Sequence, residues 1–103
     1  MLELGEVDSI KTSNWRCEQD ILQLDCGRFP SQLDFMTWAS AWLTYLGAKI
    51  NLRADGADRA QVYFVFQECM YILCFESTCE AIWIESLGEH KSQDVASILL
   101  ALN

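Results

Sequence analysis

The feature that most constrains this fold is an alternation of apolar and polar side chains that recurs from residue 48 to residue 84. A period of two sends neighbouring side chains to opposite faces of a β-strand, so each alternating run predicts a strand with one buried face. Short turn-like stretches separate the runs, which favours strands that pair with their neighbours along the chain. We therefore expect an antiparallel meander of four strands in this part of the chain.

The first hairpin of this meander is predicted from the rule that its apolar residues share one face. A loop at 55–59 then sets Leu52 opposite Val62 and Ile50 opposite Phe64. A slip of one residue would turn these apolar side chains toward water, so the sequence favours this register over its neighbours.

The later turns follow from the same rule. A turn centred on residues 68–69 sets Phe64 opposite Leu73, and a two-residue turn at 77–78 sets Leu73 opposite Ile82. A four-residue loop is an equally good interpretation of the second turn, because Ser and Thr are not the residues that tight hairpin turns prefer.

A helix is predicted ahead of the meander, between Ser31 and Gly47. Ser31 is a candidate N-cap with Asp34 three residues later, and Gly47 is suited to end the helix. The apolar residues of this segment recur at helical spacing and form one stripe, which is more typical of a core than of a ligand pocket. The stripe contains Phe35, Trp38, Ala39, Trp42, Leu43, Tyr45 and Leu46.

The remaining segments complete an α+β fold. Short strands are predicted near residues 2–7 and at 21–26, with a turn at 11–14 between them. Ser92 is the candidate N-cap of a closing helix. The apolar stripe of that helix is Val95, Ile98, Leu99 and Leu102. We expect one α+β domain over residues 1–103, with a four- to six-stranded antiparallel meander sheet and two helices packed on it.

The charge of the chain argues against several classes of partner. Asp and Glu number 15 against 7 Lys and Arg, which gives a net charge of −8 at pH 7. Nucleic acids and anionic membranes bind basic surfaces, so we expect neither as a partner. The N-terminal residues carry no basic stretch typical of a secretory signal, and no apolar run approaches the ~20 residues of a membrane span. We therefore expect a cytoplasmic protein.

Five cysteines raise the question of a metal or redox site, above all in the stretch CFESTCEAIWIES at 74–86. In the predicted register Cys74 and Cys79 lie one diagonal step apart on the same face, and Cys69 falls in a turn. These thiols do not converge as the ligands of a zinc ion do, so we expect free thiols, no metal and no other cofactor.

A third, weaker hypothesis is an enzyme that uses Glu80 and His90, the latter being the only histidine of the sequence, while Glu76 and Glu85 are expected to point outward at opposite ends of their hairpin. Glu80 is expected to point inward at the edge of the sheet, and His90 is expected in a loop. Acid–base catalysis requires such groups to meet in a cleft, so we expect no enzymatic activity and assign no catalytic residue.

The outer face of the predicted meander is unusually apolar. Pairing the strands so that their inner face stays apolar turns a second apolar set outward together. This set is Tyr63, Val65, Met70, Ile72, Cys74, Ala81 and Trp83. A patch of this size calls for a cover. The cover is either the closing helix or the N-terminal residues of the same chain, or it is another protein.

Two functions from different classes follow. The leading hypothesis is a non-enzymatic protein that binds a protein partner through the apolar sheet face, with a second copy of itself, as a homodimer, the first candidate. The alternative is a small-molecule binding protein with an aromatic pocket between the first helix and the sheet. That pocket would be lined by Trp38, Trp42, Tyr45, Phe64 and Tyr71.

The stretch from about Ile21 to the end of the chain resembles a family of short bacterial proteins, domain of unknown function 3630 (DUF3630). The matching motifs are GADRAQVYFVF at 56–66 and YILCFESTCEAIWIESL at 71–87. The order of a Trp-rich helix, a meander and a final helix matches as well. The resemblance implies this α+β fold, and it transfers no catalytic residue.

Overall fold

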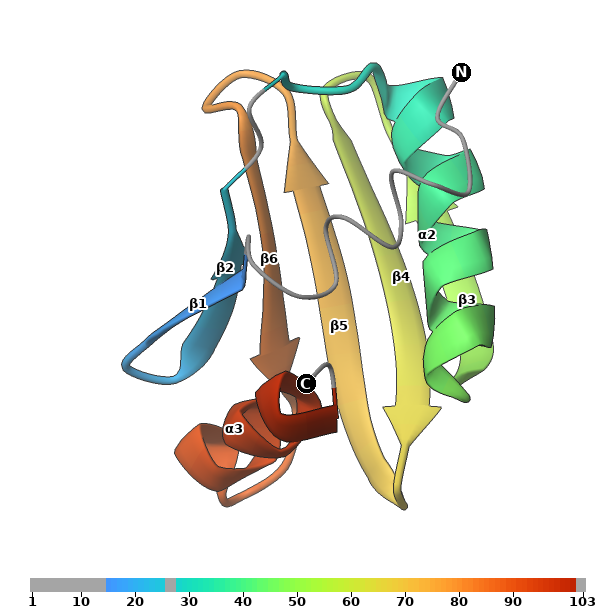
Figure 1. The fold of residues 1–103 in the computed structure, drawn as a ribbon. Coiled ribbons are helices and arrows are strands. Elements are labelled where there is room, and N and C mark those ends of the chain that lie inside the picture. The colour runs from blue at the N-terminus through green and yellow to red at the C-terminus, as the bar shows by residue number, and fades with distance from the viewer. Residues whose placement is uncertain (1–14, 26–27, 102–103) are drawn as a thin grey trace.

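The computed structural model describes residues 15–25 and 28–101, and it shows one twisted antiparallel sheet with helices α2 and α3 on the same face (Figure 1). The strand order across the sheet is β1-β2-β6-β5-β4-β3. The strands are β1 (Trp15–Glu18), β2 (Ile21–Leu24), β3 (Lys49–Asp55), β4 (Arg59–Phe66), β5 (Cys69–Glu76) and β6 (Ala81–Ser86), and the helices are α2 (Gln32–Leu46) and α3 (Lys91–Ala101). The α+β class with a meander-like sheet is confirmed.

Helix α2 begins and ends at the residues that the sequence predicts. Ser31 is its N-cap, and the Ser31 Oγ accepts a hydrogen bond from the Asp34 N–H at 3.1 Å. Gly47 ends the helix with φ +86°, a left-handed conformation that residues with a Cβ rarely adopt. The helix packs beside β3 and β4 on the inner face of the sheet (Figure 1).

The buried stripe of α2 differs from the prediction at one residue. Trp42 and Leu43 are fully buried, whereas Tyr45 is 55 % exposed. Tyr45 lies at the margin of the stripe in the last turn of the helix, where the core covers only part of its side chain. The placement of Tyr45 in the core is therefore wrong.

Helix α3 begins at Lys91, one residue ahead of the predicted N-cap Ser92. Ser92 lies in the first turn, and its hydroxyl donates to Asp20 Oδ1 at 2.6 Å. Val95 and Ile98 are fully buried, as the predicted stripe requires. The helix thus covers the end of the inner face near β6, β2 and β1 (Figure 1).

The first hairpin of the meander follows the predicted register only at Ile50 and Phe64. A β-bulge lies between Ile50 and Leu52, and beyond it Leu52 faces Tyr63. One inserted residue turns every later side chain of the strand to the opposite face. Leu52 consequently lies on the far side of the sheet from the helices and is 57 % exposed, so its predicted pairing with Val62 is wrong.

The bulge also reverses Arg53, which takes the inner side of β3. Its Nη2 donates to Ser40 Oγ of α2 at 3.3 Å. An arginine at this position adds a polar contact between the edge strand and the helix, and its aliphatic stem covers apolar surface next to it.

The hairpin of β4 and β5 is shorter than predicted. Its turn is Gln67–Glu68, both at positive φ (51° and 69°), and Phe64 pairs with Tyr71 instead of Leu73. A two-residue turn of this kind twists with the strands, and here it forms without the glycine or asparagine that usually marks it. The register is wrong by two residues, which leaves each side chain on its predicted face.

The hairpin of β5 and β6 is longer than a two-residue turn. Residues 77–80 form the loop, and Leu73 pairs with Ile84 where Ile82 was predicted. Glu80 lies in this loop, exposed and at φ 50°, so its predicted inward orientation is wrong. The shift is again two residues, and the inner and outer sets of side chains are preserved.

Strand β1 was not predicted, and it supplies a core residue. Trp15 pairs with Leu24 and is 8 % exposed. Its ring stacks on Trp42 at a centroid distance of 5.1 Å and on Trp38 at 6.4 Å, which joins α2 to the far edge of the sheet. Some predictions fall outside the described residues: the strand near residues 2–7, the turn at 11–14, and the places of Cys26 and Leu102.

Candidate interaction surface

The sheet face opposite α2 and α3, here called the outer face, carries all seven residues of the predicted apolar set. The observed pairs place them side by side: Cys74 with Trp83, Ile72 with Tyr63, Met70 with Val65, and Ala81 with Glu76. Because the registers of β5 and β6 shifted by an even number of residues, the set stayed together. The bulge adds Leu52 to it, a residue that the regular alternation of β3 had assigned to the core.

Burial differs sharply across the outer face. Ile72 and Cys74 are 7 % and 4 % exposed, although neither belongs to the main core cluster. Met70 and Leu52 are about half exposed. Within the described part of the chain, no helix packs on this face.

Trp83 lies near the centre of the outer face on β6. Its Nε1–H donates to Glu85 Oε2 at 2.8 Å, so the polar end of the indole is satisfied within the strand. The neighbouring Cys74 thiol is buried, and burial, with a smaller effect of the Glu85 carboxylate, raises its pKa to about 12. Cys74 is therefore an apolar contact residue at neutral pH and not a nucleophile.

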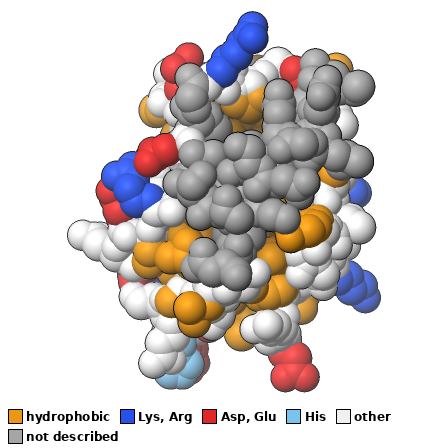
Figure 2. Space-filling model, in the orientation of Figure 1, with side chains coloured by type: hydrophobic (Ala, Val, Ile, Leu, Met, Phe, Trp, Pro, Cys, Tyr) orange, Lys and Arg blue, Asp and Glu red, His pale blue; other side chains and the backbone are white. Residues whose placement is uncertain are grey.

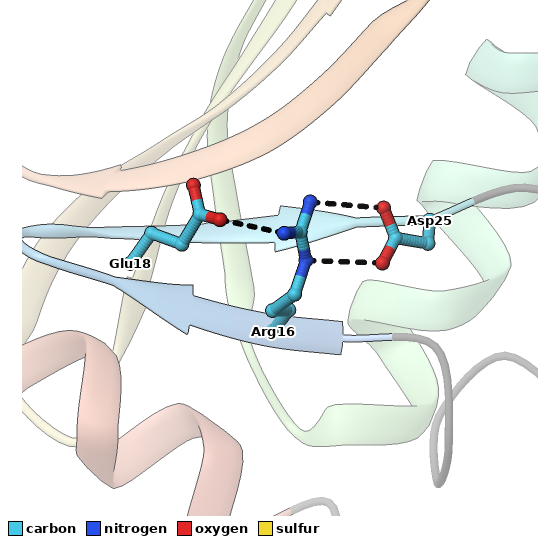
Figure 3. A network of polar contacts seen from close by, with 3 residues as sticks. All are labelled: Arg16, Glu18 and Asp25. Atoms are coloured by element: carbon cyan, nitrogen blue, oxygen red, sulfur yellow. Dashed lines mark hydrogen bonds and ion pairs between the residues drawn. The ribbon is translucent and has the colours of Figure 1, made fainter.

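Charges lie at the margins of the outer face and are divided by sign. At the β1–β2 side, Arg16 contacts two carboxylates (Figure 3): its Nη1 lies 2.6 Å from Glu18 Oε1, and its Nε lies 3.0 Å from Asp25 Oδ2. One guanidinium between two carboxylates leaves this flank net negative, and Glu85 on β6 adds to it.

The opposite flank of the outer face is basic. Lys49 on β3 faces Val65 and is exposed. Arg59 at the start of β4 faces Glu76, with its Nε 3.7 Å from Glu76 Oε2. With Asp25, which directly follows β2, counted in, the described residues give the outer face a net negative charge at β1 and β2. Lys49 and Arg59, the latter paired with Glu76 of β5, give it a net positive charge at β3 and β4.

The residues of the predicted aromatic pocket differ in exposure. Trp38, Trp42, Phe64 and Tyr71 are at most 2 % exposed and pack in the core, whereas Tyr45 faces solvent. Phe64 and Tyr71 stack on each other at 5.3 Å. Two hollows lie elsewhere, beside the β1–β2 turn and the start of α3, and none of these five residues lines either of the two.

The tryptophan cluster of the inner face has one unexplained property. The indole Nε1–H groups of Trp15, Trp38 and Trp42 are buried, and none of them donates to an acceptor among the described residues. A buried donor without an acceptor costs free energy, so three in one cluster require an explanation. Sequence reasoning placed two of these rings in a core, but their polar atoms gave no signal.

The residues considered for catalysis lie apart and in solvent. Glu80 is in the 77–80 loop and His90 precedes α3 at the opposite end of β6, and both are exposed. An open hollow of about 690 Å³ beside the β1–β2 turn is lined by Glu18, Gln19, Asp20, Ile21, Glu85 and Lys91. No group of His, Cys, Asp or Glu with a geometry for metal binding occurs in the residues that the structure describes.

The described cysteines are free thiols. Cys79 lies in the exposed loop 77–80 and not on β6, so its predicted place beside Cys74 is wrong. Cys69 contacts Asp94 at the junction with α3, where burial, followed by the carboxylate of Asp94, raises the pKa of the thiol. Low reactivity at neutral pH follows for the thiols of Cys69 and Cys74, whose pKa values are both raised.

Seen from the helix side, the charged side chains lie mainly around the rim of the molecule (Figure 2). Neither α2 nor α3 is long and apolar enough to cross a bilayer, and no other described segment forms a helix that does.

Comparison with known proteins places the chain in a family. No curated protein and no solved structure matches it. The model of one family, described as protein of unknown function (DUF3630), matches residues 12–103 and thus includes β1 and the N-terminal edge of the sheet, beyond the stretch from Ile21 on which the resemblance was noted. The chain belongs to the DUF3630 family.

Proposed function

We propose that this protein is a non-enzymatic cytoplasmic protein that works by binding protein, first of all itself, through the outer face of its sheet. One observation supports the proposal above others. An apolar set on adjacent strands, with Trp83 at its centre and Met70 and Leu52 half exposed, lies on the face without a described helix.

The composition of this face is typical of a binding surface. Trp, Tyr and Met are enriched at the cores of protein interfaces, and Trp and Tyr bury a large area there with few freely rotating bonds. The charged residues lie at its margins, as in the polar rim of an interface. The exposed positions of Glu80 and His90 and the unreactive state of Cys74 support a role without catalysis.

The proposal is tested by Trp83→Asp, with Leu33→Asp as the matched control. Leu33 is 76 % exposed in the first turn of α2, where an acidic residue is tolerated. We expect Trp83→Asp to remain folded by circular dichroism and to lose the concentration-dependent association that wild type and Leu33→Asp show in sedimentation. A Trp83→Asp variant that unfolds, together with a monomeric wild type, would show that this chain covers Trp83 itself.

A second function is favoured by the indole N–H groups of Trp15, Trp38 and Trp42, which find no acceptor among the described residues. They are suited to a small ligand that offers acceptor oxygens next to an aromatic wall. Native mass spectrometry of freshly purified protein tests this function. If a ligand is bound, we expect an added mass that is lost on denaturation and in Trp42→Ala. The mass of the chain alone would contradict this second function.

A further inference from the structure

We infer that the outer face binds a second copy of this chain about a twofold axis that lies in the interface and runs along the strands. The inference rests on the proposed function and specifies both its partner and the orientation of that partner. It is carried by the division of charge across the outer face and by the area of that face.

Charge selects the direction of the axis. An axis along the strands lays the β3–β4 flank of one copy over the β1–β2 flank of the other. Lys49 and Arg59 of one copy then face the acidic flank of the other, which carries Glu18 and Asp25. Both flanks are matched at once, because a twofold axis repeats every contact.

The alternative axis runs across the strands and sets each flank against its own image. Lys49 would then lie over the basic flank of the other copy, and Glu18 over the acidic flank. Like charges at a contact disfavour the wrong arrangement, so this orientation is selected against at both margins. Both axes keep the strands of the two sheets aligned, as sheets that pack face to face require, so the charges decide between them.

The area of the outer face fits a weak symmetric dimer. Strands about 4.8 Å apart and about six residues long at about 3.3 Å per residue give a six-stranded sheet a flat area of about 500 Å². The relief of the side chains raises the area buried per copy to about 600 Å², the lower limit for specific complexes. We therefore expect micromolar association, sensitive to single substitutions.

Association is tested by a charge exchange in the full chain. Lys49→Glu and Glu18→Lys are each expected to weaken self-association about tenfold at low salt, because each reversal acts at two symmetry-related contacts. An equimolar mixture of the two variants restores the wild-type affinity, since each acidic flank meets a basic one again. Arg53→Glu is the matched control, because Arg53 lies on the inner side of β3 and contacts Ser40 of α2.

Sedimentation velocity over a range of protein concentrations, at low salt and at about 0.5 M salt, supplies the measurement. Dimers that weaken with salt, and that recover only in the mixture, support the inference. If the charge variants associate like wild type while Trp83→Asp is monomeric, the inferred orientation of the two copies is wrong. The proposed function is then still supported. Species that grow beyond the dimer overturn the twofold axis.

Discussion

Ser86 and Asp94 join the end of β6 to the first turns of α3 through a hydrogen bond of 2.6 Å from the Ser86 hydroxyl to Asp94 Oδ2. Ser86 is 1 % exposed, and its Oγ also accepts from the Gly88 N–H at 3.0 Å. The Tyr71 hydroxyl donates to the Asp94 carbonyl oxygen at 3.0 Å from β5. A polar cluster thus anchors a helix whose apolar contact is small.

Ser86→Ala is expected to destabilise the fold by about 1–3 kcal/mol, because it leaves the Gly88 N–H without its acceptor and the partly buried Asp94 carboxylate without its donor. Ser97→Ala is the control, since the Ser97 hydroxyl only donates to the Gln93 carbonyl on the exposed side of α3. Urea denaturation followed by circular dichroism gives both values. Equal midpoints for the two variants would show that the cluster does not anchor α3.

Gly47 and Gly56 provide a test of backbone conformation alone, because a Cβ at either position meets no atom within 4 Å. Gly47 has φ +86°, where alanine is strained, so Gly47→Ala is expected to cost about 1 kcal/mol. Gly56 has no such φ, and Gly56→Ala is expected to be neutral or to stabilise by a few tenths of a kcal/mol. Thermal unfolding of both variants measures the difference, and its reversal would contradict the left-handed cap.

Trp42→Ala is expected to destabilise the fold by about 3–5 kcal/mol, because Trp42 is fully buried and stacks on both Trp15 and Trp38. Thr44→Ala, on the exposed face of the same helix, removes only a hydroxyl that donates to the Ser40 carbonyl at 2.8 Å. Denaturant midpoints are expected to fall strongly in the first variant and hardly in the second.

The raised pKa of the Cys74 thiol predicts that the free energy of unfolding falls at alkaline pH. Burial and the Glu85 carboxylate raise the pKa of this thiol from 9.0 to about 12, so above pH 9.0 the unfolded chain releases a proton that the folded chain retains. Rising pH then favours unfolding by about 1 kcal/mol per pH unit until the folded thiol ionises near pH 12.

The measurement compares the stability of wild type and Cys74→Val against pH. Below pH 9.0 the two curves should run parallel, and above it the wild type should fall more steeply. Cys17→Ser is the control, because the Cys17 thiol is exposed on β1. A slope unchanged in Cys74→Val would show that another group is responsible.

Alternation predicted the faces of this sheet better than its registers. Phe64 and Leu73 both lie inward as predicted, although neither has its predicted partner. A hairpin can shift by two residues without moving any side chain to the other face, so periodicity does not distinguish such registers. The turns decide between these registers. The turn Gln67–Glu68 adopts positive φ although it contains no glycine, so the sequence did not indicate it.

Other features left no periodic signal. The bulge before Leu52 interrupts a strand whose sequence alternates regularly, so burial of that residue was the natural expectation. Strand β1 is four residues long, and of these only Trp15 is buried, which is too little for a pattern. The residues of the candidate surface were nevertheless predicted. The face on which Trp83 and Tyr63 lie changes only if a register shifts by an odd number of residues, and both registers shifted by two.

The bulge in β3 also limits how many chains can join. β3 is an edge of the sheet, and its break in regular pairing, together with Lys49 and Arg53, makes it a poor template for a further strand. The other edge, β1, is only four residues long. With both of these edges blunted, growth of the sheet from chain to chain into fibrils is disfavoured. The same irregularity that exposes Leu52 thus also protects a chain with an apolar sheet face from aggregation.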